Sequence, residues 1–273
     1  MLKKLMATAA LALSAAFIGV PDASAVIVSW DYKIQAGFSF FTPVGFVTPS
    51  LTGSLGEPTK LSWGNPTIGG QSALVILEPI ATPFYGGTGA PLITSSIIGV
   101  PGITLIHENR PITGFDPGAL TDATLDLKAT LSPTGGPSVP GPLPIIAFHI
   151  KFKETLNMAP CAVSASVIPC DDIFVLSDPA NLTSTVPGPD GLFYQVTVHV
   201  AGLGLLDAAT CAAVGVAAGC TGLTTPEGSD STIPTSFEIH AVNPVPEPAT
   251  LLLLGSGVIG LGLYRRKKGN GKV

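Results

Sequence analysis

Short runs of alternating hydrophobic and polar residues dominate the middle of the chain. In TLDLKATL, residues 124–131, every second residue is apolar and the residues between them are polar or charged. Similar alternation recurs in IIAFHIKF (145–152), YQVTVHV (194–200) and FEIHA (237–241). A period of two is typical of a β-strand with one face in the core and the other in water. Further candidate strands lie at 26–41, 60–64, 72–77, 103–108 and 173–176.

These runs, about nine in all, are separated by turns rich in Gly and Pro, and long stretches of helical period are missing. Strands without crossover helices pair antiparallel, so we predict an all-β fold, an antiparallel β-sandwich that spans residues 26–242. Residues 207–235 are rich in Ala and Gly and are predicted to form a long loop. Asp207 is placed to cap a short helix inside it.

The first 25 residues have the three parts of a secretory signal. Lys3 and Lys4 precede an uncharged apolar stretch, 5–20, and Ala23-Ser24-Ala25 follows. A positive start, an apolar run and small residues at the cut occur in the order that secretion requires. We predict a signal peptide over 1–25, with Ala23 and Ala25 as the small residues of the cleavage site and Val26 as the first residue of the mature chain.

The other end of the chain predicts one transmembrane helix. Residues 249–264 are 16 residues without a charge, and Arg265, Arg266, Lys267 and Lys268 follow directly. A helix of this length covers about 24 Å, somewhat less than a hydrocarbon core of ~30 Å. Such a short span suits a transient membrane stage, in which the four cations stay cytoplasmic and the body lies outside.

The segment before this span is rigid and recognisable. Val245, Pro246, Glu247 and Pro248, followed by the Leu- and Gly-rich run and the basic end, closely resemble the PEP-CTERM sorting signal, here residues 243–268. The resemblance implies a Gram-negative bacterium that builds exopolysaccharide. It also implies secretion machinery and a membrane exosortase as partners, a transient inner-membrane intermediate and a final place at the cell surface or outside the cell.

The charge of the body argues against some partners. Without the two signals the chain keeps six Lys and Arg against sixteen Asp and Glu, a net charge near −10. Nucleic acids and anionic lipids attract basic surfaces, so neither is expected as a partner.

All four cysteines lie in the exported body at two equal spacings. They are Cys161 with Cys170, in CAVSASVIPC, and Cys211 with Cys220, in CAAVGVAAGC. An even count in an oxidising compartment predicts disulfides, and four cysteines allow three connectivities. The matching spacings make the two local pairs the simplest choice. A zinc site is the alternative, but the gaps differ from the usual ligand spacing.

The most distinctive stretch of the body is TLIHENRPI, residues 104–112. Continued alternation from Leu105 places His107 and Asn109 on the inner face, with Ile106 and Glu108 outside. An inward His and Asn satisfy each other or nearby backbone through hydrogen bonds, or else form a ligand-binding or catalytic pair. The structural role is the prediction, since a nucleophile or third orienting group is not evident nearby.

This stretch resembles part of a body type called the THxN family of PEP-CTERM proteins, as do KLSWGNP (60–66), FHIKFKETLN (148–157) and CDDIFVL (170–176). His107 and Asn109 match the naming motif, but Ile106 stands where that family has Thr. The family has no established activity to carry over.

Two other sets of side chains are weighed as metal sites. The adjacent Asp171 and Asp172 form a calcium site if carbonyls and a third acid converge on them, and otherwise cap a turn. His149, His199 and His240 are predicted to face outward on late strands and form a site if those strands are neighbours. The prediction is that the chain has no metal, no cofactor and no catalytic residue.

Familiar enzyme motifs, such as Gly-x-Ser-x-Gly and His-Glu-x-x-His, are not found in the sequence. We therefore predict a non-enzymatic surface or matrix protein with a structural or adhesive role, in contact with exopolysaccharide or other matrix proteins. The alternative is a secreted carbohydrate-binding or carbohydrate-active protein that uses Asp171, Asp172 or other loop acids. An ice- or mineral-binding surface fits less well, because flat arrays of Thr are missing.

Overall fold

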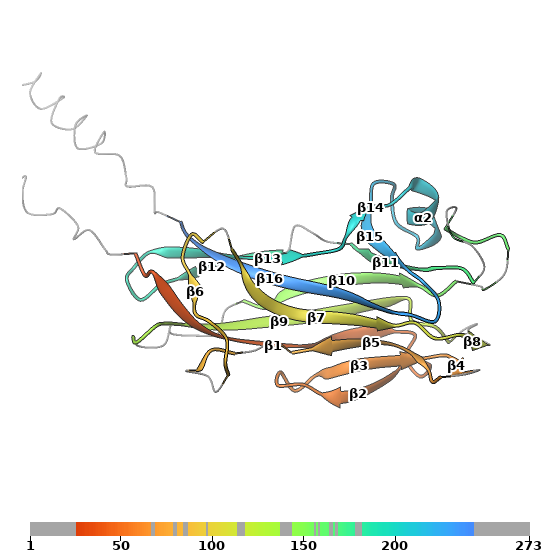
Figure 1. Ribbon diagram of the computed structural model, residues 1–273, viewed down its shortest axis with the longest axis horizontal. Coiled ribbons are helices and arrows are strands. Elements are labelled where there is room, and N and C mark those ends of the chain that lie inside the picture. The colour runs from red at the N-terminus through yellow and green to blue at the C-terminus, as the bar shows by residue number, and fades with distance from the viewer. Residues whose placement is uncertain are drawn as a thin grey trace, which may run out of the picture.

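We analysed a computed structural model of the protein (Figure 1). It describes residues 26–66, 69–78, 81–83, 87–96, 98–113, 118–136, 144–155, 157, 159–163, 166, 169–177 and 182–242. The predicted signal peptide, the sorting signal and the helix over 249–264 lie outside these residues. Within them, no helix is long and apolar enough to cross a membrane.

Two seven-stranded antiparallel sheets form the body, which is all-β as predicted. The first sheet has the order β14-β15-β11-β10-β9-β1-β6. Its strands are β1 (Ser29–Thr42), β6 (Leu92–Ile93), β9 (Asp122–Pro133), β10 (Ile146–Lys153), β11 (Asp172–Leu176), β14 (Gly204–Leu205) and β15 (Thr221–Thr225).

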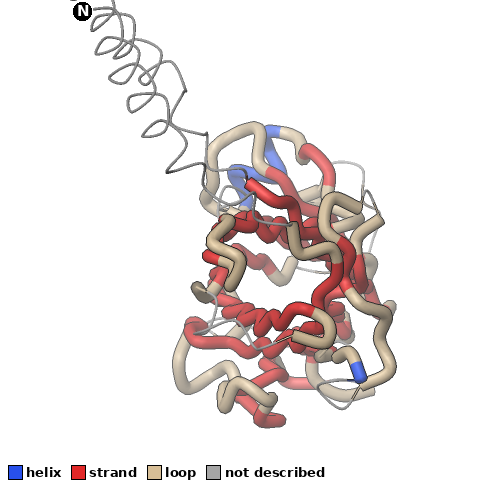
Figure 2. The backbone as a smooth tube through the Cα atoms, turned by 90° about the vertical axis from the view of Figure 1, so that its left-hand side faces the viewer, coloured by secondary structure: helices blue, strands red, loops and turns tan. Residues whose placement is uncertain are grey.

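The second sheet has the order β12-β13-β16-β7-β5-β3-β2. Its strands are β2 (Thr48–Thr52), β3 (Pro58–Trp63), β5 (Ser72–Leu77), β7 (Val100–Glu108), β12 (Thr183–Pro187), β13 (Phe193–Val200) and β16 (Asp230–Val242). A separate small pair joins β4 (Asn65–Pro66) to β8 (Ile112–Thr113). Figure 2 shows the strands of the body in two layers.

The two sheets share one hydrophobic core. Buried and partly exposed residues alternate along β9 and β10, as the sequence pattern predicts. Trp30 of the first sheet meets Tyr194 of the second edge to face, with ring centroids 4.7 Å apart, and Tyr32 meets Phe237 in the same way at 4.9 Å. Such pairs contribute about 0.5–1.5 kcal/mol each beyond the area that they bury, so they hold the layers together.

The predicted loop over 207–235 is only partly correct. Asp207 does cap a helix, α2 (Ala208–Ala213), by accepting a hydrogen bond from the Thr210 backbone N–H. However, the same stretch also contains β15 and the first residues of β16. The run TGLTT of β15 lacks hydrophobic alternation, and its pairing with β11 determines its conformation instead.

Both local disulfides are present in the structure. Cys161 pairs with Cys170 and Cys211 pairs with Cys220, each across a sequence separation of 9 residues. The first closes the segment before β11, and the second joins α2 to the residue before β15. Each therefore fixes the start of a strand in the same part of the first sheet.

The described chain begins and ends at one end of the long axis. In Figure 1, β1 starts and β16 finishes at the left-hand end, while β7, β15 and the start of β16 meet near the other end. The side chains described below lie at that second end, far from the point where the sorting signal leaves the body.

Replacing Cys211 and Cys220 together by Ala should lower the free energy of unfolding by about 2–3 kcal/mol, because the unfolded chain loses a short cross-link. Urea denaturation of the oxidised proteins measures this change. Ala212→Ser, at an exposed neighbouring position of α2, is the matched control and should change stability far less. Non-reducing peptide maps that link Cys161 to Cys211 or Cys220 would contradict the pairing.

Candidate metal centre

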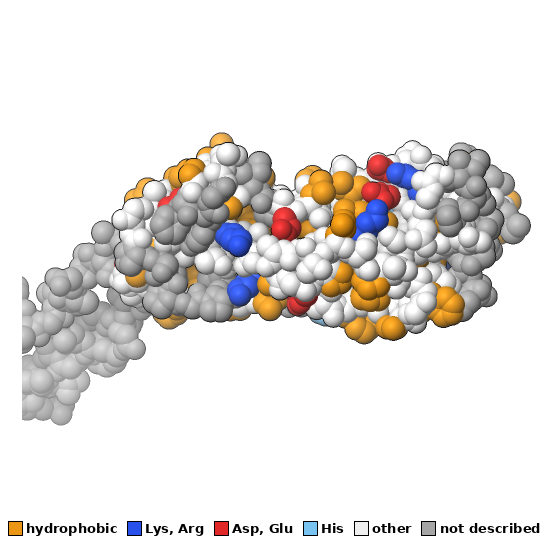
Figure 3. All heavy atoms as spheres, turned by 90° about the horizontal axis from the view of Figure 1, so that it is seen from below, with side chains coloured by type: hydrophobic (Ala, Val, Ile, Leu, Met, Phe, Trp, Pro, Cys, Tyr) orange, Lys and Arg blue, Asp and Glu red, His pale blue; other side chains and the backbone are white. Residues whose placement is uncertain are grey.

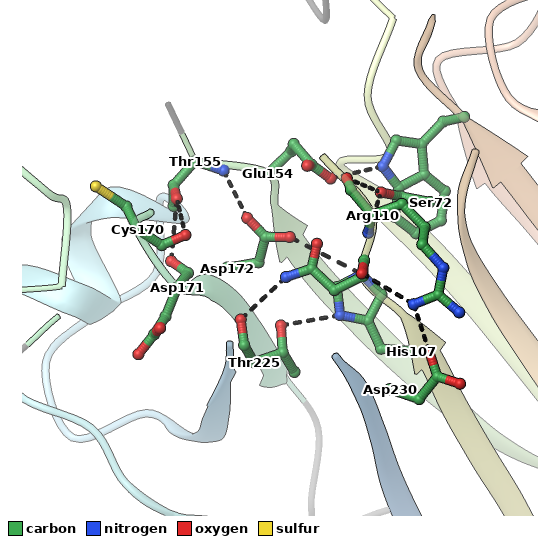
Figure 4. Close-up of polar contacts among 12 residues, drawn as sticks. Ser72, His107, Arg110, Glu154, Thr155, Cys170, Asp171, Asp172, Thr225 and Asp230 are labelled. Atoms are coloured by element: carbon green, nitrogen blue, oxygen red, sulfur yellow. Dashed lines mark hydrogen bonds and ion pairs between the residues drawn. The ribbon is translucent and has the colours of Figure 1, made fainter. Parts of the chain in front are cut away.

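The end of β7 places two polar side chains in the core. His107 and Asn109 are both 0% exposed, whereas Ile106 and Glu108 are only partly buried. The alternation of β7 therefore continues past Leu105 with polar residues on its inner side, as the sequence predicts. Both side chains point toward the first sheet, where they meet the end of β15 (Figure 4).

Thr225, the last residue of β15, holds both of these side chains. Its hydroxyl lies 2.8 Å from His107 Nδ1, and its backbone carbonyl accepts a hydrogen bond of 3.1 Å from Asn109 Nδ2. The amide nitrogen of Asn109 is thus engaged, and its Oδ1 points elsewhere. These contacts join the second sheet to the first.

Glu154 follows directly after β10 and is 5% exposed. One of its carboxylate oxygens accepts a hydrogen bond of 2.7 Å from the indole Nε1 of Trp63, on β3 of the opposite sheet. The ring of Trp63 stacks on the His107 imidazole, with an interplanar angle of 13°, and Phe152 packs edge-on against both rings. Aromatic rings thus form an apolar wall on one side of the polar groups.

Asp172 opens β11 and is 0% exposed. Its Oδ1 accepts a hydrogen bond of 2.8 Å from the Thr155 backbone N–H, and the Thr155 hydroxyl donates to the carbonyls of Cys170 and Asp171. Cys170, which forms the disulfide with Cys161, lies two residues before Asp172 and is itself hydrogen-bonded to Thr155, so the disulfide helps to position Asp172. Figure 4 shows Asp171 and Asp172 pointing in different directions, so the two do not form the paired site considered from the sequence.

Glu227 completes the group from the turn between β15 and β16. Burial raises the pKa of Glu227, and weak hydrogen bonding from the side chains of Asn157 and Asn109 opposes the rise. These contacts are too long or too bent to be full hydrogen bonds, so neither of its two buried carboxylate oxygens has a well-formed partner among the described residues. The name polar cluster is used below for His107, Asn109, Glu154, Asn157, Asp172 and Glu227.

The polar cluster gathers most of the unpaired buried polar atoms of the described chain. Nine buried side-chain atoms have no hydrogen-bond partner there, and seven of them belong to the cluster. They are His107 Nε2, Asn109 Oδ1, Glu154 Oε1, Asn157 Oδ1, Asp172 Oδ2 and both carboxylate oxygens of Glu227. Each such atom normally costs about 1–3 kcal/mol, so this part of the described chain would gain most from a bound cation or ordered water.

Burial shifts the pKa values of the carboxyl groups in the polar cluster away from their values in water. It raises the pKa of Glu154 to about 8, with a contribution from the charge of Glu227, although the Trp63 hydrogen bond opposes the rise. Burial and then Glu154 raise the pKa of Asp172 well above its usual value, and burial also raises the pKa of Glu227. The carboxyls thus favour their neutral forms when only protons are available.

Burial, and to a smaller extent the charge of Arg110, lowers the pKa of His107 to about 3. The imidazole is therefore neutral, and its contact of 3.9 Å with Asp172 Oδ2 is not an ion pair. Neutral imidazole is the form that binds a metal ion, through whichever ring nitrogen carries the lone pair. When Nδ1 carries the proton and donates it to the Thr225 hydroxyl, the lone pair is on Nε2, and Nε2 is then the nitrogen that can bind a metal ion.

Three residues of the cluster have the spacing of metal ligands. One ligand atom each from His107, Glu154 and Asp172 lies within 4.8 Å of the other two. Ligands on opposite sides of one ion, with bonds of ~2.1–2.4 Å, are about 4.2–4.8 Å apart. The three therefore have the geometry to share a single ion.

The rim beside the cluster is charged and opens to solvent. Arg110 pairs with Asp230 at 2.5 Å, and the Ser72 hydroxyl holds the Arg110 backbone through two hydrogen bonds of 3.0 and 3.1 Å. A surface hollow lined by Arg110, Pro111, Gly228, Ser229 and Asp230 adjoins this ion pair. It lies next to the turn that carries Glu227.

The three histidines predicted on outer faces do not come together. His149 lies on β10 of the first sheet, whereas His199 and His240 lie on β13 and β16 of the second. The latter two contact Glu238 at 3.0 and 3.2 Å and lower its pKa. The proposed three-histidine site is therefore not formed.

Glu154 and Glu227 were missed by sequence reasoning. A signal for Glu154 did exist, because the alternation of β10 buries Phe152 and exposes Lys153, so the next position faces inward. For Glu227 the sequence has no comparable signal, since it lies in a turn that only the meeting of β15 and β16 brings to the cluster.

Comparison with known proteins identifies a family motif in one part of the chain. A family model described as the PEP-CTERM protein-sorting motif matches residues 244–268, which include Val245 to Pro248 and the four cations. The motif indicates an exported protein that an exosortase processes on its way to the cell surface. No curated protein matches the chain significantly. The likeness of the body to the THxN proteins stays a prediction.

In buffer with EDTA, the stability of the protein should fall as pH rises from about 4.5 to about 8. Glu154 keeps its proton in the folded state up to a pKa of about 8, whereas the unfolded chain loses it near 4.5. The folded state therefore binds more protons over this window, and stability falls by at most about 1.4 kcal/mol per pH unit from this group.

Glu154→Gln cannot titrate and should flatten that dependence, with the largest gain over the natural protein near pH 8. Thermal unfolding at a series of pH values measures it. Asp171→Asn is the control, because Asp171 is only partly buried and points away from the cluster. Equal slopes for the Gln variant and the natural protein would contradict the assigned burial of the Glu154 charge.

Proposed function

We propose that the body is a structural or adhesive component of the cell surface or extracellular matrix, in contact with exopolysaccharide or other matrix proteins. The sorting motif at 244–268 carries this proposal. The resemblance of these residues to the PEP-CTERM signal implies an exosortase system in a bacterium that builds exopolysaccharide. The exported body would then arrive in the layer where such polymers accumulate.

The architecture supports a role as a durable module. Two packed sheets and two disulfides fix the described body, and the ends of the described chain lie together at one end of its long axis. On the face seen in Figure 3, acidic, basic and hydrophobic side chains are interspersed. Such a mixed surface suits many weak contacts with hydrated polymers better than one deep pocket does.

The acids of the polar cluster are poorly placed for hydrolysis of a glycan. Asp172 is 0% and Glu154 5% exposed, and the rings of Trp63 and Phe152 cover one side. A glycosidase must place two carboxyl groups on either side of a bond in its substrate. We therefore propose a non-enzymatic role, with a carbohydrate-binding protein as the alternative.

The route to the surface is part of the proposal. The signal peptide starts export, the span over 249–264 halts the chain in the inner membrane, and Arg265 to Lys268 hold the tail on the cytoplasmic side. The prolines at 246 and 248 keep the cleavage segment extended, so an exosortase at the membrane surface can reach it.

Replacing Pro246, Glu247 and Pro248 by Ala should leave export and folding unchanged but block processing. The uncut protein should then stay in the inner membrane. An epitope inserted after Val242 and cell fractionation follow its location. Pro244→Ala, in the same spacer but outside the Pro-Glu-Pro, is the matched control. If the triple variant reaches the surface as efficiently as the natural protein, the Pro-Glu-Pro is not the recognised element.

The processed protein should co-sediment with the extracellular polysaccharide of its host and should release no reducing sugar from it. The measurement compares bound protein in a pull-down with purified polymer and a reducing-sugar assay on the same samples. Release of sugar would favour the carbohydrate-active alternative. Absence of the protein from both the polymer and the matrix fraction would contradict the adhesive role.

A further inference from the structure

We propose that the polar cluster binds one divalent first-row transition cation, such as Zn²⁺ or Mn²⁺, with His107, Glu154 and Asp172 as its central ligands. The ion joins the two sheets at the end of the body opposite the end of β16 at Val242. This proposal goes beyond the surface role and departs from the sequence prediction of no metal site.

The unpaired atoms of the cluster are all of one chemical kind. His107 and Asn109 are 0% exposed and each carries one unpartnered atom, and His107 Nε2 lies 3.9 Å from Asp172 Oδ2. Carboxylate and amide oxygens are acceptors, and so is an imidazole nitrogen without a proton. Seven such atoms gathered in one place favour a partner that several of them share. A cation is such a partner.

The remaining atoms of these side chains are held by the protein. Trp63 holds one oxygen of Glu154, Thr155 holds one oxygen of Asp172, and Thr225 holds the other nitrogen of His107. Asn109 is held in the same way through its amide nitrogen. Partners that fix one atom of a ligand and aim the other inward are the usual supports of a protein metal site.

Protonation explains the cluster less well than a cation does. The three carboxyl groups of Glu154, Asp172 and Glu227 accept at most one proton each, which turns three of the seven atoms into donors for the remaining four and leaves one acceptor without a partner. A divalent ion interacts with four to six ligand atoms and offsets two of the three negative charges in one step. The imidazole in particular gains a partner only if a carboxyl proton is directed at it.

The donor set indicates which kind of ion fits. Calcium takes six to eight oxygen ligands, whereas imidazole suits first-row transition ions. One nitrogen at the centre of the site, from His107, therefore favours Zn²⁺ or Mn²⁺ over Ca²⁺. Glu227 and Asn109 lie beside the central three and supply the further oxygen ligands.

A surface hollow lies beside the site. The hollow at Arg110, Pro111 and Gly228 to Asp230 adjoins the turn of Glu227. The positive charge of Arg110 does not oppose entry strongly, because Asp230 lies 2.5 Å from its guanidinium and Glu108 also acts on it.

The test uses the full chain in detergent, stripped with EDTA and then dialysed against Zn²⁺, Mn²⁺, Ca²⁺ or Mg²⁺. Binding of Zn²⁺ to the exposed His199 and His240 is removed by making every measurement in a His199→Gln/His240→Gln background. Calorimetry measures affinity and stoichiometry, and thermal unfolding gives the shift in Tm. We expect one Zn²⁺ or Mn²⁺ per chain and a rise in Tm of about 5–10 °C at a hundredfold excess over Kd.

Asp172→Asn and Glu154→Gln keep the shape of the site and should each weaken Zn²⁺ binding by at least about tenfold, as loss of a ligand charge does. Asp171→Asn, next to a ligand but directed away, is the matched control and should bind like the parent. Near-ultraviolet circular dichroism of each variant without metal verifies its fold. Cobalt(II) bound at the site should also give visible absorption bands that disappear in Asp172→Asn.

Three results would overturn the proposal. The first is no binding of Zn²⁺ or Mn²⁺ at 1 mM, far above the concentration at which a built site fills. The second is binding that Asp171→Asn weakens as much as Asp172→Asn does. The third is Ca²⁺ or Mg²⁺ binding more tightly than both transition ions. None of these depends on where the protein is sorted, so the surface role can fail or hold independently.

Discussion

Ionisable groups taken out of water must be neutralised or paired, and this constraint governs one end of the molecule. Three carboxyls and an imidazole are enclosed where β7 and β3 of one sheet face β10, β11 and β15 of the other. A single unpaired charge in such surroundings would oppose the packing of both sheets. The arrangement of hydrogen bonds from Trp63, Thr155 and Thr225 is therefore as much a part of the fold as the hydrophobic core.

The neighbouring elements all serve to keep that arrangement fixed. The Cys161–Cys170 disulfide and the Thr155 hydroxyl anchor the chain just before β11, so Asp172 enters the core at a defined position. On the other side, Cys211–Cys220 and the Asp207 cap fix α2 before β15. Away from this end, the Trp30–Tyr194 and Tyr32–Phe237 contacts hold the sheets by aromatic packing.

The alternating pattern was enough to predict the all-β class, the main strands such as β9, β10 and β13, and the inward direction of His107 and Asn109. It missed β15, because Gly and Thr carry no amphipathic signal and the strand forms by pairing with β11. It weighed Asp172 together with Asp171 as a calcium site or a turn cap, whereas pairing opposite Thr225 buries Asp172. The cluster itself follows from the meeting of four strand ends, which no local pattern encodes.

The exit of the chain from β16 determines how the body would bear mechanical load. Hydrogen bonds in an antiparallel sheet run perpendicular to the strands. A pull on Val242 along the strand axis therefore loads the ladder with β13, from Phe193 opposite Val242 to Val200 opposite Thr235, in shear and all at once. Farther along, β7 shares the load through its pairing with the first half of β16. A protein held at this end resists extension because many hydrogen bonds of the ladder carry the load together. If the strand were instead peeled away from its tip, these hydrogen bonds would break one at a time.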